Sequence, residues 1–207
     1  MKKMTMIGSM VAGVSVVAGC ATVATDSDYG KIALAMMKAD FKTKGPATAE
    51  RVFQQDEVER ACSTVSQTVP ADQSARLQAA QLASVVFPSD GKYLGDWKAG
   101  EAIAQNGRGL QSSDTAGTVN GGNCYACHQI TKDEISYGNI GPSLYNYGKL
   151  RGQSEPIVKY TWSKLYNAQA YNLCSNMPRF GHKGILTQAQ LKDVMALLLD
   201  PASPVNK

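Results

Sequence analysis

The chain has 207 residues, of which 43% are hydrophobic and 18% are charged, and its formal net charge is +4. A chain of this length can bury a substantial core, which predicts one domain with extensions. Without Lys2 and Lys3 the charge falls to about +2, so the chain lacks the strong positive field of a nucleic-acid-binding protein.

The N-terminus carries a targeting pattern. Lys2 and Lys3 precede residues 4–19, which are uncharged and mostly small or apolar. This pattern predicts a signal peptide over residues 1–19, because the apolar stretch is short for a membrane span. We therefore expect an exported, periplasmic protein.

The end of this segment, Val17-Ala18-Gly19-Cys20, resembles a bacterial lipobox. A lipobox predicts that Cys20 becomes the lipidated first residue of the mature protein. The lipid would anchor the protein to a membrane face without spanning the bilayer. Ordinary cleavage near Ala21 is the alternative interpretation, and it leaves a protein without a lipid.

Residues 20–93 are predicted to form a helix-rich extension. Residues 47–66 have a helical charge pattern and contain Cys62, and a second helical stretch follows over residues 77–86. Turn-forming Gly-Pro and Pro-Ala-Asp sequences separate the stretches. The sequence shows no internal repeat and no strong alternation of apolar and polar residues that would indicate strands.

Residues 94–207 are predicted to form an all-α domain. Asp96 is a good N-cap for its first helix, and another helix is expected over residues 154–168. The last helix has the clearest signals, because Thr187 and Gln190 form a capping box. Its apolar residues follow at helical spacing: Leu191, Val194, Met195 and Leu198.

The most informative sequence is Cys124-Tyr125-Ala126-Cys127-His128. A Cys-x-x-Cys-His sequence is typical of c-type haem attachment, in which Cys124 and Cys127 form thioethers with the two haem vinyl groups. His128 follows Cys124 by four residues, so on a helical turn it projects from the same face and can bind the iron. The sequence therefore predicts one covalent haem c.

Two other interpretations fit the cysteine pair. A structural zinc site would need two further ligands, for which only Cys174 and His182 are available. A dithiol redox centre usually accompanies a βαβ pattern, which the sequence does not show.

Haem iron also has a sixth position, for which Met177 is the predicted ligand. It lies in Asn176-Met177-Pro178-Arg179-Phe180-Gly181, a loop stiffened by proline. A thioether ligand favours ferrous iron and raises the reduction potential. The rival ligand is His182, which would lower the potential, and the other alternative for Met177 is a role as core filler. The carbonyl of Pro142 is expected to accept the Nδ1 proton of His128.

Five cysteines are present, and two remain after Cys20 and the two haem cysteines are set aside. Exported proteins often pair such leftover thiols, which predicts a disulfide between Cys62 and Cys174. In the chain-entropy model a loop of this length is worth about 4–5 kcal/mol. Two separate buried thiols are the alternative.

Residues 129–185 hold more basic than acidic side chains. The basic ones are Lys132, Lys149, Arg151, Lys159, Lys164, Arg179 and Lys183, and the acidic ones are Asp133, Glu134 and Glu155. We expect these cations either to offset haem propionates and form a positive rim for an acidic partner, or to be an ordinary solvated surface.

Taken in chain order, these features resemble a class I cytochrome c. They are an N-terminal helix, the Cys-x-x-Cys-His sequence, Gly141-Pro142, a Met-Pro loop and a final helix. The resemblance covers roughly residues 94–200. It implies a helical fold around one covalent haem, in which the first and last helices cross beside the haem.

A longer set of sequences is similar to the SoxX family, the monohaem cytochrome subunits of SoxAX sulfur-oxidation complexes. The set comprises GDWKAGE (residues 95–101), GGNCYACH (121–128), GNIGPSL (138–144), YNA (166–168), CSNMPRFGH (174–182) and DPASPVN (200–206). It is specific and covers about half of the chain. The lipobox-like sequence departs from this family, whose members are soluble periplasmic subunits.

The resemblance implies that the chain pairs with a SoxA-like cytochrome subunit. In that family the complex oxidatively joins thiosulfate to a cysteine of a SoxYZ-like carrier, and the reactive cysteine belongs to SoxA. The SoxX subunit takes the electrons on its His/Met haem and passes them to a soluble cytochrome c. The chain would then be enzymatic only as a subunit, with no catalytic residue of its own.

Two other functions fit the same haem motif. One is an independent monohaem electron carrier that serves a respiratory oxidase. The other is a haem-based ligand-binding or sensing protein, which would need a weak or absent sixth ligand.

Overall fold

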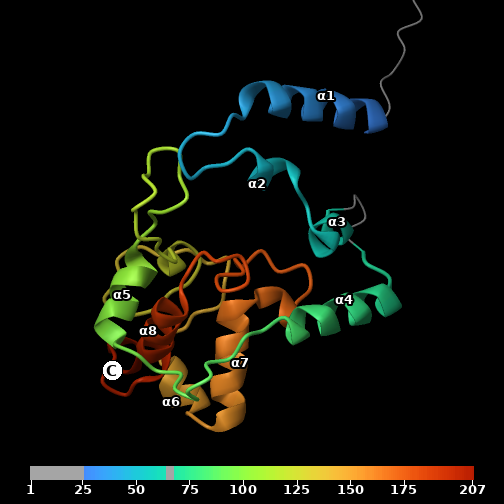
Figure 1. Cartoon of the computed structure of the whole chain (residues 1–207). Coiled ribbons are helices and arrows are strands. Elements are labelled where there is room, and N and C mark those ends of the chain that lie inside the picture. Colours follow the sequence, from blue (N-terminus) through green and yellow to red (C-terminus); the bar gives the residue numbers. More distant parts are fainter. Residues whose placement is uncertain (1–25, 64–67) are drawn as a thin grey trace, which may run out of the picture. The chain divides into compact units, whose positions relative to one another are not determined.

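The computed structural model describes residues 26–63 and 68–207. The predicted signal peptide over residues 1–19 and Cys20 therefore lie outside the described residues. Within the described part the regular elements are α-helices and short 3₁₀ helices, with one isolated β-bridge and no strand (Figure 1). The prediction of an all-α fold is confirmed.

The described part of the chain divides into two units, with the boundary between Phe41 and Lys42. The described element of the first unit is α1 (Asp26–Asp40). The second unit contains α2 (Glu50–Phe53), α3 (Glu57–Cys62), α4 (Ala71–Ala83), α5 (Trp97–Gln105), α6 (Tyr147–Arg151), α7 (Glu155–Tyr166) and α8 (Gln188–Leu199). Its 3₁₀ helices are η1 (Cys124–Ala126), η2 (Ala168–Ala170) and η3 (Pro204–Asn206). Most of the predicted extension, residues 42–93, thus packs in the same unit as the helical domain.

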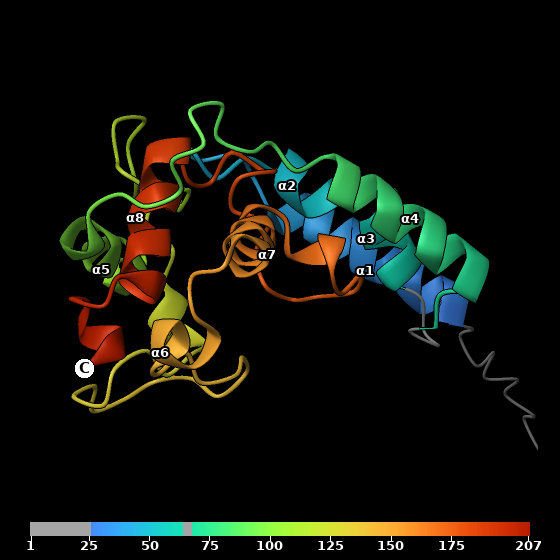
Figure 2. The same ribbon diagram turned by 90° about the horizontal axis from the view of Figure 1, so that it is seen from below.

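Helices α5 and α8 lie side by side in both views (Figures 1 and 2). Asp96 caps α5 as predicted, because its side chain accepts from the backbone N–H of Lys98 at 2.9 Å. The backbone N–H of Asp96 in turn donates to the Asp193 carboxylate of α8 at 2.9 Å. Gly100 brings the two backbones into direct contact, since a Cβ at that position would lie 2.1 Å from the carbonyl oxygen of Asp193.

We expect Gly100→Ala to destabilise the fold by about 3 kcal/mol, because a methyl group cannot enter this contact unless the helices move apart. Gly117→Ala is the control, since a Cβ at Gly117 meets no atom within 4 Å. The control should shift stability by no more than about 0.5 kcal/mol. Urea unfolding of both variants measures the difference, and equal stability would contradict the close helix contact.

Helix α8 supplies much of the core. Its capping box is present as predicted: the Thr187 hydroxyl accepts from the backbone N–H of Gln190, and the Gln190 side chain accepts from the backbone N–H of Thr187. The apolar residues predicted to share one face are all buried: Leu191, Val194, Met195 and Leu198. Trp162 of α7 packs against them and donates its indole N–H to the carbonyl of Val86 at 3.0 Å.

The stretch predicted as helical over residues 47–66 contains two short helices, α2 and α3, rather than one. The helical stretch is interrupted at Asp56, because Asp56 forms a capping box with Glu59 and so begins a new helix. Val58 of α3 packs with Leu77 of α4 and with Leu173, which forms a small core distinct from that around α8. This small core joins the extension to the domain that follows it, because Leu173 lies outside the extension.

The predicted disulfide between Cys62 and Cys174 is confirmed. Cys62 is the last residue of α3, and Cys174 lies three residues before Met177. The bridge joins positions 112 residues apart. It ties the extension to the loop that carries the predicted sixth ligand.

Candidate haem site

The segment that leads into the Cys-x-x-Cys-His sequence is hydrogen-bonded to the C-terminal end of α5. The backbone N–H of Gly122 donates to the carbonyl of Ile103 at 2.8 Å, and that of Asn123 donates to Asn106 at 3.0 Å. Cys124 starts the 3₁₀ helix η1, and its carbonyl accepts from the backbone N–H of His128 at 2.9 Å. This bond makes the helical turn that the spacing predicts.

Cys124 and Cys127 are free thiols. Cys124 packs against a buried cluster contributed by α5, α8, the C-terminal segment and the loop that follows the motif: Ala104, Leu197, Val205 and Ile130. Burial raises the pKa of Cys124 to about 12.

The imidazole of His128 is oriented by the segment that follows it. Its Nδ1 lies 2.7 Å from the carbonyl oxygen of Pro142, which can only accept, so Nδ1 carries the proton. The expected role of this carbonyl is confirmed. Gly141 lies directly against the imidazole ring, because a Cβ at this glycine would come within 2.1 Å of Cε1 of His128. The hydrogen bond at Nδ1 leaves Nε2 as the nitrogen that can bind a metal.

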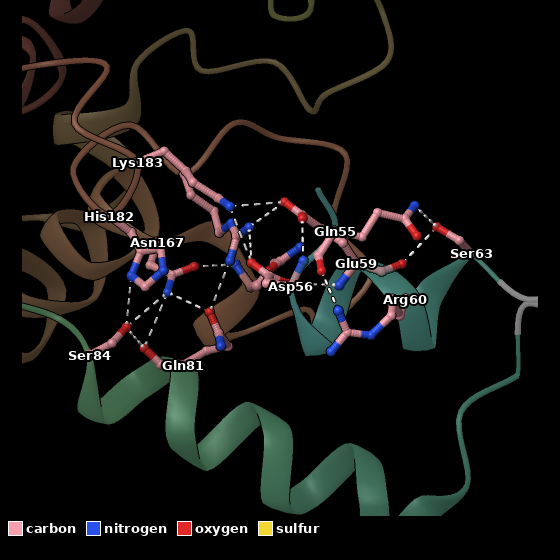
Figure 3. A network of polar contacts seen from close by, with 12 residues as sticks. Gln55, Asp56, Glu59, Arg60, Ser63, Gln81, Ser84, Asn167, His182 and Lys183 are labelled. Atoms are coloured by element: carbon pink, nitrogen blue, oxygen red, sulfur yellow. Dashed lines mark hydrogen bonds and ion pairs between the residues drawn. The ribbon is translucent and has the colours of Figure 1, made fainter. Parts of the chain in front are cut away.

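Met177 is half-buried against the main core and lies in the irregular loop 174–181. It lines a cavity of about 610 Å³ together with Ile185 and several polar side chains of α2, α3 and the loop. His182 does not line this cavity. Its Nδ1 instead lies 3.2 Å from the hydroxyl of Ser84 at the end of α4 (Figure 3). His182 is thus in contact with α4, and Met177 as the sixth ligand stays a prediction.

The cavity is not lined by Cys124, Cys127 or His128. The two predicted halves of the site are joined through neighbouring residues instead. The side chain of Asn120 donates to the carbonyl of Ile185 at 2.9 Å. Leu186 comes within 3.8 Å of a Cβ built on Gly122. The segment that precedes the attachment motif is thus fastened to the chain that follows the Met177 loop.

The donor set fits a c-type haem. Two unpaired thiols are available for thioethers, an imidazole is held with one nitrogen uncommitted, and a thioether lies beside a cavity. Any side chain in place of Gly141 would collide with the imidazole of His128. The structural zinc alternative is wrong, because Cys174 is in a disulfide and the described residues hold no group of three or more His, Cys, Asp or Glu side chains placed to bind a metal.

A buried ion-pair network lies beside Met177, and the sequence did not indicate it. Arg179 is 4% exposed, and its Nη2 lies 2.5 Å from both the Asp56 and the Glu59 carboxylates. Lys183 approaches the same two carboxylates at 3.3 and 3.2 Å. These two cations are paired with acids of the extension, so they do not add unpaired positive charge to residues 129–185.

The pKa of Asp56 depends on this network. Burial would raise it, but the backbone N–H of Glu59 and the cations of Arg179 and Lys183 outweigh burial and lower the pKa from 3.8 to about 2. A depressed carboxylate pKa gives stability that is present above the unfolded-state value and is lost as the pH falls toward 2.

We therefore expect the wild type to be more stable than Asp56→Asn at pH 6, with the difference vanishing near pH 2. Asparagine keeps the helix cap, so the comparison isolates the charge. Urea unfolding at several pH values measures it. A difference that stays constant from pH 6 to pH 2 would contradict the assignment.

Residues 94–200 match the cytochrome c family, and because this match spans just over half of the chain, the chain belongs to that family. It therefore carries covalently attached haem c with its iron, and it acts in haem-based electron transfer. The helical fold is that of a class I cytochrome c.

The chain is also similar to a protein of Aquifex aeolicus (strain VF5) described as an "Uncharacterized lipoprotein". The two are 37% identical over 177 residues, which cover 82% of this chain and 84% of the relative. The similarity extends well beyond the cytochrome c match and so includes the extension. Among the residues that the structure describes, no helix is long and apolar enough to cross a membrane.

Proposed function

We propose that this chain is the electron-transfer subunit of a SoxAX-type L-cysteine S-thiosulfotransferase. Joining a carrier thiol to thiosulfate through a new S–S bond releases two electrons and one proton. The chain accepts these electrons one at a time and passes them to a soluble cytochrome c. The proposal is supported by the SoxX-like sequences around the attachment motif and the Met177 loop.

The observation that carries the proposal is the set of cysteines. Cys62 and Cys174 are bonded to each other, which leaves Cys124 and Cys127 as the free thiols of the described residues. Once these two are used for haem attachment, no described thiol remains to react with a sulfur substrate. A partner must then supply the reactive cysteine, as in a two-subunit complex.

We infer that Cys124 and Cys127 form the thioethers and that His128 and Met177 are the axial ligands. The bound haem supplies the one-electron chemistry of its iron. The Pro142 carbonyl fixes the tautomer of His128 and increases the basicity of its Nε2. Met177 provides a soft, neutral thioether that favours the ferrous state and so makes the chain a good electron acceptor.

Affinity purification of the tagged chain from native periplasm and membranes tests the proposal. We expect a second haem protein to co-purify, and the haem of this chain to become reduced when thiosulfate and the carrier protein are added. A chain that purifies alone and stays oxidised with thiosulfate would instead be an independent carrier to an oxidase. Carbon monoxide binding to the reduced, folded protein would indicate a ligand-binding protein.

We further propose that removal of residues 1–19 leaves a mature, exported protein anchored through a lipid on Cys20. The name of the Aquifex relative and the lipobox-like sequence support this. Mass spectrometry of the mature N-terminus tests it, with a diacylated Cys20 as the expected result. An unmodified N-terminus beyond residue 20 would contradict the anchor and leave a soluble periplasmic protein.

A further inference from the structure

The loop that carries Met177 is held at its two ends by backbone hydrogen bonds: the N–H of Ser175 donates to the carbonyl of Asn172 at 3.0 Å, and that of Gly181 donates to the carbonyl of Tyr166 at 3.1 Å. Residues 174–181 contain no helix or strand, and the backbone N–H of Met177 is satisfied by the hydroxyl of Ser175 at 3.2 Å. Between these two bonds, the position of the Met177 thioether depends on the side chains that hold the loop, among them Phe180, which is buried in the main core.

Two further contacts that hold the loop come from α3. Cys62, at its C-terminal end, is bonded to Cys174, three residues before Met177. Asp56 and Glu59, at its N-terminal end, hold Arg179, two residues after Met177. One short helix of the extension, α3, is thus linked to the loop both before and after the predicted ligand.

The capping box orients the side chains of Asp56 and Glu59 toward Arg179. Asp56 Oδ1 accepts from the backbone N–H of Glu59, and Glu59 Oε2 accepts from the backbone N–H of Asp56. The remaining oxygens, Asp56 Oδ2 and Glu59 Oε1, both accept from Nη2 of Arg179 at 2.5 Å. The cap therefore fixes both carboxylates in the position that receives the guanidinium.

The rest of the surroundings hold the guanidinium and the helix in place. Nη1 of Arg179 lies 3.4 Å from the side-chain oxygen of Gln81 in α4, and Val58 anchors α3 in the small core with Leu77. Through Arg179 the loop is thus in contact with two helices of the extension, α3 and α4.

We propose that Arg179 is a positioning residue for Met177, and that α3 keeps the thioether in place for the iron. The proposal rests on Met177 being the sixth ligand, as inferred above. A thioether is a neutral ligand, so its bond depends on a loop that is already ordered. Glu59, Cys62, Cys174 and Arg179 also line the cavity beside Met177, so the residues that hold the loop surround the side chain that they position.

The test compares haem-loaded full-length proteins. Arg179→Gln removes the cation, and Glu59→Gln removes one anion while its amide oxygen can still accept in the cap. The control is the double variant Glu57→Gln/Arg76→Gln, because this pair joins α3 to α4 at 2.6 Å but both side chains are more than half exposed. All three variants change charges on or against the same helix.

Two measurements report on the bond to Met177. One is the intensity of the ferric absorption band that marks sulfur ligation, and the other is the rate at which added imidazole binds the ferric protein. We expect Arg179→Gln and Glu59→Gln to lose at least half of the band and to bind imidazole at least tenfold faster. The control should stay within twofold of the wild type in both.

Variants that are folded and haem-loaded but match the wild type in both measurements would overturn the positioning role. If Arg179→Gln yields no folded protein, Glu59→Gln alone decides, and wild-type behaviour of that variant overturns the proposal. A wild type without the sulfur band is a separate result, because it shows that Met177 is not the ligand and removes the basis of the proposed function as well.

Discussion

The double variant Cys124→Ala/Cys127→Ala should contain no covalently bound pigment. Both thiols are unpaired, and they lie on the turn that also positions His128. Without them no thioether can form, and we expect less than a tenth of the wild-type haem signal after denaturing electrophoresis and haem staining.

The control for this prediction is the other cysteine pair. Cys62→Ala/Cys174→Ala should keep its pigment and lose about 2–5 kcal/mol of stability, because it removes a bridge between positions 112 residues apart. Pigment that stays bound to the Cys124→Ala/Cys127→Ala protein would contradict the assignment of the attachment site.

Met177→Ala should lower the reduction potential by on the order of 0.1 V and remove the ferric band of sulfur ligation, because axial ligands set haem potentials over a range of about 0.8 V. Redox titration followed by absorbance measures the shift. Alanine is expected to leave an open coordination position beside the cavity of about 610 Å³, so the reduced variant should bind carbon monoxide.

Met195→Leu is the matched control, because Met195 is the other methionine of residues 94–207 and is fully buried in α8. This swap nearly conserves volume, so it should cost less than about 1.5 kcal/mol and keep the band. A Met177→Ala protein with an unchanged spectrum and potential, together with a His182→Ala protein that loses them, would assign the ligand to His182 instead.

Features set by local chemistry could be predicted from the sequence. The Asp96 cap, the Thr187–Gln190 capping box and the buried face of α8 depend on residues within a few positions of one another. The hydrogen bond from His128 to Pro142 followed from the need of a metal-binding imidazole for an acceptor. The disulfide followed from elimination, since two thiols were left over in a chain expected to be exported.

Features that depend on pairing between distant segments could not be predicted. Arg179 and Asp56 are 123 positions apart, so nothing in the sequence showed that they meet. Counting charges over residues 129–185 suggested an excess of cations there, but two of them are neutralised by the extension. The contact of Gly100 with the backbone of Asp193 is of the same kind, because a glycine within a helical pattern does not reveal which backbone it touches.

The role of the extension is also a result of tertiary structure. The charge pattern of residues 47–66 indicated helix, and the Asp56–Glu59 cap that divides the stretch is a local signal of the usual type. That the same two acids also bind Arg179 required the fold. Residues 42–93 therefore act as part of the haem-bearing unit, and the match to the Aquifex relative extends beyond the cytochrome c region.

Intact mass spectrometry of the mature protein after extraction with acidified acetone tests the central claim most directly. The account predicts a chain heavier by the mass of one haem, with the pigment retained in the protein pellet and mapped to the peptide that contains Cys124 and Cys127. A colourless pellet with an unmodified polypeptide mass would contradict it.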